Sequence, residues 1–209
     1  MLRNIYMSAI LAAVILFKLP CAEMAPTTYG PTGLIDIPTS DIVRTDQMEV
    51  GYYSLDKKNY EVFALPLTKN IEISGSLRNE DKEHTLKTLN AKVNIRQEKI
   101  LNPGIALGVY DMANNDKRSV YISASKAVPF GLRLTAGVGT NYYKDGFVGV
   151  ETRLIPLSKG GSFPDMSLMI EHIDKKTSYG LRMATARGLQ ITAGWRDKEP
   201  FWGITYTVP

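Results

Sequence analysis

The chain of 209 residues is poor in cysteine and histidine, and it contains only one long apolar run. That run covers residues 8–17, follows Arg3 and precedes Pro20-Cys21-Ala22. A basic start, a short apolar core and small residues after a proline are typical of a Sec signal peptide, and the run is too short for a spanning helix. We therefore assign residues 1–22 to a signal peptide, which implies export.

Cleavage is expected after Ala22, with Cys21 and Ala25 as alternative positions. Lipidation of Cys21, the only cysteine, is the other reading, although Lys18 and Pro20 depart from the usual lipidation pattern. Without lipidation, the mature chain contains neither a disulfide nor a thiolate metal site.

The overall composition also excludes several classes of protein. Hydrophobic residues make up 44% of the chain, which is too little for a bundle of membrane helices. The net charge of +4 comes from 25 basic and 21 acidic residues that are interspersed. This mild excess favours contact with anionic lipid or polysaccharide and gives no reason to expect nucleic acid.

Most of the chain alternates apolar and polar residues in short segments that are separated by turn signals. In residues 189–196 the odd positions are apolar and the even positions are polar or glycine. This period of two predicts strands with one apolar and one polar face. Many such strands after a signal peptide are typical of an outer-membrane β-barrel.

We predict an all-β, antiparallel up-and-down transmembrane barrel over residues 46–209, with twelve strands. The expected strands are 46–54, 59–65, 70–78, 85–96, 104–112, 118–128, 131–142, 146–155, 165–173, 177–186, 189–196 and 201–208. Residues 131–137 and 188–194 are similar in sequence. This similarity suggests either a three-fold repeat of four-strand units or a chance likeness among alternating strands.

Charged residues occur at mid-strand positions on the polar face, where they are too costly to place against lipid. We therefore predict that they line the lumen: Glu49, Glu61, Glu72, Arg78, Lys92, Arg96, Glu151, Arg153, Glu171, Arg182 and Arg196. Aromatic residues near strand ends predict interfacial girdles: Tyr52, Tyr142, Tyr143, Tyr179, Phe201 and Trp202. The alternative is a soluble barrel or sandwich with the two faces exchanged.

The turns between strands alternate in chemistry. Charged turns such as 56–59 and 174–176 alternate with turns rich in proline, glycine and apolar residues, such as 128–131. Successive hairpins turn at opposite ends of a barrel, so each end has its own character. With an even number of strands both termini lie at one end, which is periplasmic by the usual rule.

A lead segment, residues 23–45, separates the signal peptide from the first strand. It contains Gly30-Pro31-Thr32-Gly33-Leu34-Ile35-Asp36-Ile37-Pro38-Thr39-Ser40, which resembles the N-terminal signature of the YjbH family. Residues 119–126 and the strand that follows are also similar to that family. The resemblance implies an outer-membrane β-barrel linked to exopolysaccharide production. Typical members are much longer, so this chain resembles a single unit.

The lead motif offers no acid–base pair and no ligand set beyond the lone Asp36. Its docking residues are predicted to be Gly30, Pro31, Gly33, Leu34, Ile35, Asp36, Pro38 and Thr39. We expect the lead to dock at the periplasmic rim or lower wall, burying Leu34 and Ile35 while Asp36 caps amides or pairs with a base. A lumen plug or a ligand contact is the alternative.

Catalytic chemistry has one candidate, His172, which shares the apolar face of its predicted strand with Leu168 and Ile170. The nearby hydroxyls Ser167 and Ser178 fall on the opposite face, so a nucleophile–base pair is not supported. No metal-ligand cluster, phosphate loop or dinucleotide motif is present, and we expect no cofactor.

We therefore expect a non-enzymatic outer-membrane component of exopolysaccharide biosynthesis, secretion or surface organisation. Its partners would be outer-membrane lipid, the barrel-assembly machinery, and a polysaccharide or a secretion-machinery protein. The alternatives are a small-solute diffusion pore and a lipid-modifying enzyme that uses His172.

Overall fold

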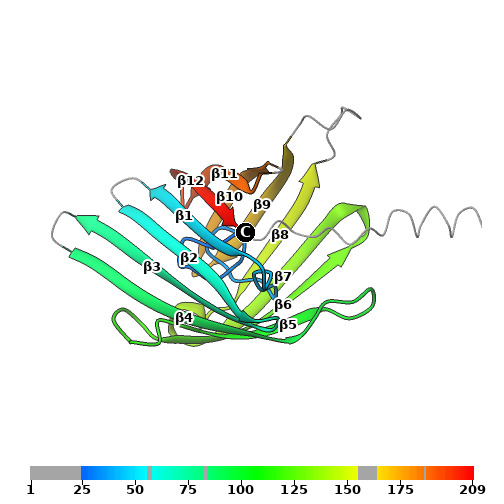
Figure 1. Ribbon diagram of the computed structural model, residues 1–209, viewed down its shortest axis with the longest axis horizontal. Coiled ribbons are helices and arrows are strands. Elements are labelled where there is room, and N and C mark those ends of the chain that lie inside the picture. The colour runs from blue at the N-terminus through cyan, green and yellow to red at the C-terminus, as the bar shows by residue number, and fades with distance from the viewer. Residues whose placement is uncertain (1–24, 56–57, 82–83, 155–163, 186) are drawn as a thin grey trace, which may run out of the picture.

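Twelve antiparallel strands form a closed up-and-down barrel, in which each strand pairs with its neighbours in sequence and β1 pairs with β12. The computed structural model describes residues 25–209 except 56–57, 82–83, 155–163 and 186. The predicted signal peptide lies outside the described residues. Figure 1 shows the ring of strands, with the blue N-terminal segment inside it.

The strands are β1 (Met48–Leu55), β2 (Lys58–Thr68), β3 (Ile71–Asp81), β4 (His84–Arg96), β5 (Gly104–Tyr110), β6 (Ser119–Val128), β7 (Leu132–Gly139), β8 (Phe147–Leu154), β9 (Asp165–Ile173), β10 (Lys176–Ala184), β11 (Leu189–Arg196) and β12 (Glu199–Val208). Two short 3-10 helices, η1 (Pro129–Gly131) and η2 (Asn141–Tyr143), lie on either side of β7. The predicted fold and number of strands are confirmed.

Most strands differ from their predicted bounds by one to three residues, and two of these differences have a clear structural cause. The strand expected at 131–142 ends at Gly139, because the chain turns into η2 and carries Tyr143 into the barrel. The strand expected at 59–65 extends to Thr68, although it contains Pro66. The register shifts between Pro66 and Thr68, so the proline lies at an irregularity where a ladder hydrogen bond is not required.

The two faces of the barrel have opposite chemistry. Every strand exposes large apolar side chains on the outer surface of the barrel. Leu134, Ile170 and Ile204, for example, are 44%, 56% and 43% exposed. Charged side chains such as Glu72 and Lys92 are buried inside. A soluble barrel has the reverse arrangement, so this fold is built for a lipid surround. Among the described residues, no helix has the length and apolar character to cross a membrane.

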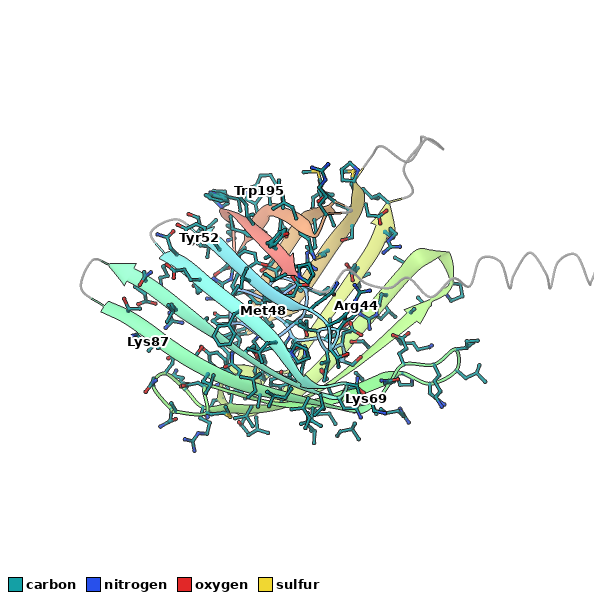
Figure 2. The ribbon with its side chains drawn as sticks, viewed as in Figure 1. Arg44, Met48, Tyr52, Lys69, Lys87 and Trp195 are labelled. Atoms are coloured by element: carbon teal, nitrogen blue, oxygen red, sulfur yellow. The ribbon has the colours of Figure 1, made fainter. Side chains whose placement is uncertain are left out.

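Both ends of the strand sequence lie at the same end of the barrel. Met48 at the start of β1 pairs with Val208 at the end of β12. We call this the terminus end, and it also carries the turn at Lys69. The opposite end carries the charged connections, and Figure 2 places Tyr52 there, far from Lys69.

Glycine and aromatic residues pair across neighbouring strands on the inner wall. Tyr53 lies opposite Gly203, Tyr121 opposite Gly108, and Phe147 opposite Gly137. A β-carbon on Gly137 would lie 2.2 Å from the Phe147 ring and 2.5 Å from the Ile122 carbonyl oxygen. Each of these rings therefore covers the backbone of a glycine that has no side chain to obstruct it.

Replacement of Gly137 by valine should destabilise the barrel by about 1–3 kcal/mol, because the added atoms overlap a buried ring and a backbone carbonyl. Urea unfolding followed by tryptophan fluorescence measures this loss. Gly131→Asn is the matched control, since Gly131 has φ of 73° and open space around it, and asparagine tolerates positive φ. Equal stability of the two variants would contradict this packing account.

Candidate functional site

The lead lies inside the barrel, so the expected position at the periplasmic rim or lower wall is wrong and the alternative, a lumen plug, is correct. Leu34, Ile35 and Ile37 are 2%, 1% and 0% exposed. The amides of Ile35 and Ile37 and the carbonyl of Leu34 are hydrogen-bonded to side chains of the inner wall. The physical reason is that a twelve-stranded lumen has room for an irregular chain, and its polar wall supplies partners for the buried backbone.

The lead forms a tight double turn that requires its two motif glycines. Isolated bridges join Pro26 to Thr32 and Gly33 to Pro38. Gly30 has φ of 109°, and a β-carbon there would lie 2.8 Å from a wall carbonyl oxygen. A β-carbon on Gly33 would lie 2.1 Å from the carbonyl oxygen of Ile37. Gly30 is therefore required by its backbone conformation and by close approach, and Gly33 by close approach alone.

Glu171 of β9 binds the tip of the lead through backbone amides. Its carboxylate accepts hydrogen bonds from the amides of Ile35 at 3.0 Å, Asp36 at 2.8 Å and Ile37 at 3.3 Å. The side chain is buried, and it satisfies three consecutive donors that no strand partner reaches. Charge-assisted bonds of this kind are the strong ones in a low-dielectric interior.

Asp36 of the lead pairs with Arg196 of β11 and accepts a hydrogen bond from the Thr28 hydroxyl. Arg196 also donates to the Tyr29 hydroxyl at 2.7 Å, and its guanidinium lies 5.4 Å from the centre of the Tyr29 ring. The predicted partner of Asp36 is thus a base, but that base lies inside the lumen.

A cross-strand ion pair holds the other turn of the lead. Glu72 of β3 and Lys92 of β4 lie 3.3 Å apart and face each other in the register. The Glu72 carboxylate accepts from the Thr32 amide at 2.9 Å and from the Val43 amide at 3.2 Å. Lys92 donates to the Thr32 carbonyl at 2.8 Å. The two side chains therefore bind each other and also bind backbone groups of the lead.

Other wall residues also bind backbone groups of the lead. Arg182 donates to the Leu34 carbonyl at 2.7 Å. Further contacts come from three wall residues whose roles the strand pattern did not reveal: Asn90 donates to the Tyr29 carbonyl, Asn94 donates to the Ser40 carbonyl, and Ser125 accepts from the Ser40 amide. Short polar residues on the inner face of an alternating strand were the available signal.

Arg133 of β7 is the centre of a second charge cluster, near the terminus end. It pairs with Asp41 of the lead and lies 3.1 Å from Glu98. Burial alone would raise the pKa of Asp41, but the charge and hydrogen bonds of Arg133, together with Lys92 and Thr39, outweigh burial and hold this pKa below its usual value. Sequence reasoning missed this cluster, because its members come from the lead, a loop and a strand.

Most residues predicted to line the lumen do point into it. Six are buried there: Glu49, Glu72, Lys92, Glu151, Glu171 and Arg182. Three are half-buried on the same face: Arg78, Arg153 and Arg196. Glu72 and Lys92 form a cross-strand ion pair, whereas Glu171, Arg182 and Arg196 bind the lead.

Two predicted lumen residues were placed wrongly. Glu61 points outward and pairs in register with the exposed Tyr52, because Tyr60 and Val62 of β2 face inward and pack against the lead. Arg96 is exposed at the end of β4, where the register shifts after Asn94, and it donates to the Pro103 carbonyl.

An aromatic cluster lies inside the barrel toward the charged connections. The Tyr29 ring of the lead contacts Tyr60, Tyr110 and Tyr142 at centroid distances of 6.2, 5.5 and 5.0 Å. Burial raises the pKa of Tyr29 to about 12, so its hydroxyl is neutral at physiological pH. The cluster covers this side of the lead with rings.

The predicted aromatic girdle is therefore only partly correct. Tyr52, Tyr179 and Trp202 are exposed on the outer surface, and Tyr52 and Trp202 lie 5.8 Å apart. Tyr142, Tyr143 and Phe201 instead belong to the interior. Tyr142 and Tyr143 turn inward because η2 reverses the chain there, and Phe201 is inward by the alternation of β12.

His172 is exposed on the outer surface of β9. Its Nδ1 lies 2.9 Å from the Thr177 hydroxyl, which is its cross-strand partner on β10. The hydroxyl comes from a threonine that sequence reasoning had not considered. In the described part of the chain, no group of three or more His, Cys, Asp or Glu side chains is arranged to hold a metal ion.

Comparison with known proteins gives one family and one fold. The family model YjbH, described as "Exopolysaccharide biosynthesis protein YbjH", matches residues 25–163. A search of the curated proteins found no match.

Two similar solved structures are a "KdgM porin", with TM-score 0.53 and 8% identity, and a "KdgM porin in complex with disordered oligogalacturonate", with TM-score 0.52 and 7% identity. Each comparison covers 78% of this chain and 98% of the other. At such low identity the likeness shows the porin barrel fold alone.

The double variant Leu34→Asp/Ile35→Asp should release the lead while the strands remain intact. The two apolar side chains contribute about 3–5 kcal/mol through burial before ordering costs, and two new carboxylates would lie near Glu171. Limited proteolysis should cut the lead of the variant much faster, with unchanged strand content by circular dichroism. The Leu34→Met variant is the volume-matched control, and equal proteolysis of all three proteins would refute this.

Acid should loosen the lead through Asp41. The folded pKa of Asp41 is below the ordinary value of 3.8. Asp41 therefore contributes fully to the stability of the docked lead above pH 3.8, and this contribution is lost as pH falls through the folded pKa. Pepsin digestion at a series of acidic pH values should therefore show a step in lead cleavage below about pH 4. In the Asp41→Asn variant the lead should already be held less tightly at neutral pH. Its cleavage should then lack the part of the acid-induced step that protonation of Asp41 causes. An identical profile for both proteins would exclude Asp41 as the cause.

Proposed function

The chain belongs to the YjbH family, and from this membership and its plugged barrel we propose that it is a non-enzymatic outer-membrane component of exopolysaccharide secretion or surface organisation. The observation that carries the proposal is the position of the lead. The family match begins at residue 25 and therefore includes the described lead together with β1 to β8. The lead is thus part of what resembles the family, whereas its wall partners Glu171, Arg182 and Arg196 lie beyond the matched residues.

The outer surface supports a place in the outer membrane. Exposed apolar side chains surround the barrel, while the buried charges face the lumen. A hydrocarbon surround favours this arrangement, because unpaired charges on the outer face would be costly. We infer periplasmic termini from the even number of strands, with the charged connections at the cell surface. Outer-membrane lipid and the barrel-assembly machinery are the partners that such a barrel requires.

A small-solute diffusion pore is the second candidate, and the porin-like fold favours it. One of the similar porins is described in complex with disordered oligogalacturonate, so this barrel architecture is compatible with a carbohydrate. The lead opposes free diffusion of solutes through the barrel, because its buried groups occupy the lumen and are hydrogen-bonded to the wall. We therefore favour a closed resting state over an open pore.

A lipid-modifying role for His172 has less support. The histidine pairs with a threonine, and this contact is the cross-strand pair that the register of β9 and β10 creates. A hydroxyl–histidine contact on a sheet surface also stabilises the sheet without any reaction. We keep the non-enzymatic role as the proposal, with a polysaccharide or a secretion-machinery protein as partner.

A planar-bilayer recording on the refolded protein tests the closed lumen. The intact chain should show no porin-sized conductance, and the Leu34→Asp/Ile35→Asp variant should open frequent channels. The Leu34→Met variant should behave as the intact chain does. Porin-sized conductance in the intact protein would favour the diffusion-pore candidate instead.

The role in secretion requires a separate measurement in cells. A strain that lacks the protein should have less surface exopolysaccharide, and the wild-type chain and its His172→Ala variant should restore it equally. Normal polysaccharide in the deletion strain would refute the proposed function. Failure of His172→Ala to restore it, with normal barrel assembly, would favour the enzymatic alternative.

A further inference from the structure

The lead places a carboxylate on a wall arginine at each end of the lumen. Asp36 pairs with Arg196, which lies at the end of β11 next to the charged connections. Asp41 pairs with Arg133, which lies at the start of β7 near the terminus end. Two anionic groups of one chain are thus bound along the path from one opening toward the other.

Between these arginines the wall binds mainly backbone groups of the lead, together with the Thr32 hydroxyl. Glu171 accepts from three amides, Arg182 and Lys92 donate to carbonyls, and Asn90 donates to a further carbonyl. A sugar hydroxyl can both donate and accept a hydrogen bond, so it can replace either kind of backbone group. The lead therefore presents carboxylates and neutral donors and acceptors, which are also the groups of an acidic polysaccharide.

The carboxylate contacts of the lead restrict which occupant can replace it. Its two carboxylates each pair with a wall arginine, Asp36 with Arg196 and Asp41 with Arg133. Removal of the lead would leave Arg196 without a carboxylate and Arg133 with Glu98 alone, which is costly unless another anion takes the place of the lead.

We propose that the lumen is a binding path for an acidic polysaccharide and that the lead is its competitive occupant. Carboxylates of the polysaccharide bind Arg133 and Arg196, while its hydroxyls take the contacts that the lead backbone makes in the closed state. Binding of the polysaccharide and docking of the lead exclude each other. This inference rests on the proposed function, since it names the class of the exported polymer.

Release of the lead can be followed with a cysteine reporter in the full refolded chain. In a Cys21→Ser background, Ile37→Cys places a thiol at a position that is 0% exposed, and a maleimide reagent labels it only when the lead leaves. Lys69→Cys at an exposed turn controls for reagent access. The probe is oligogalacturonate, and a neutral cello-oligosaccharide of equal length is its control.

Oligogalacturonate should raise the labelling rate of the Ile37→Cys protein by about tenfold or more at saturation, and added salt should weaken this response. The neutral oligosaccharide should leave the rate unchanged. Labelling at Lys69→Cys should not respond to either sugar. Equal responses to the acidic and the neutral sugar, or no response to either, would overturn the proposal.

Two pairs of variants separate competition from simple loss of structure. Asp36→Asn/Asp41→Asn weakens the lead but keeps both arginines, so half-maximal labelling should need about tenfold less oligogalacturonate. Arg133→Gln/Arg196→Gln also weakens the lead, but its labelling should no longer depend on oligogalacturonate. If these side chains only stabilise the barrel, both pairs would raise basal labelling and leave the sugar dependence unchanged, which would refute the proposal.

Barrel integrity in each variant is checked by heat-modifiable migration on gels, so that an unfolded protein is not mistaken for a released lead. The binding measurement uses purified protein and does not depend on secretion. Displacement of the lead by oligogalacturonate supports this inference even where the deletion strain makes normal polysaccharide. Reduced polysaccharide in that strain, together with no displacement, overturns this inference and leaves the proposed function standing.

Discussion

A buried irregular chain needs a partner for each of its backbone donors and acceptors, and this constraint determines the interior of the barrel. The lead takes no part in the strand ladders of the barrel, so its own turns satisfy some of these groups and wall side chains satisfy others. Glu171 accepts hydrogen bonds from three amides, and Arg182 donates to a carbonyl. In the Glu72–Lys92 pair, Glu72 accepts from amides and Lys92 donates to a carbonyl. The charged side chains of the inner wall therefore do more than contact water, because they bind the lead that closes the lumen.

The contacts that hold the lead in the lumen are also the contacts that a competing polymer would have to replace. Contacts with backbone groups and two carboxylates hold the lead, and groups of the same chemistry on another polymer can compete for them. An apolar plug would be held by burial alone, and a hydrophilic polymer could not replace it. The aromatic cluster around Tyr29 adds apolar packing on one side, so the closed state combines both kinds of contact.

Residue patterns were sufficient to predict the barrel. Period-two alternation, charged and proline-containing turns, and the even strand number predicted twelve antiparallel strands with apolar outer faces. Local chemistry also predicted positive φ or close backbone approach at the motif glycines, and Gly30 shows both while Gly33 shows close approach. It predicted that Asp36 caps amides or pairs with a base, and the pairing with a base is found. These features depend on neighbours in sequence or on one face of a strand, and such information is present in a single chain.

Alternation alone determined that a strand has two faces, but not what each inner face contacts. Glu61 was assigned to the lumen because it is charged, whereas Tyr60 and Val62 occupy that face to pack on the lead. Arg133 meets Asp41 and Glu98 only after the barrel closes around the lead. The sequence determined the strands and the motif, because they follow from local periodicity and backbone geometry. The tertiary structure alone decided that the lead fills the lumen, because that depends on contacts between residues distant in sequence.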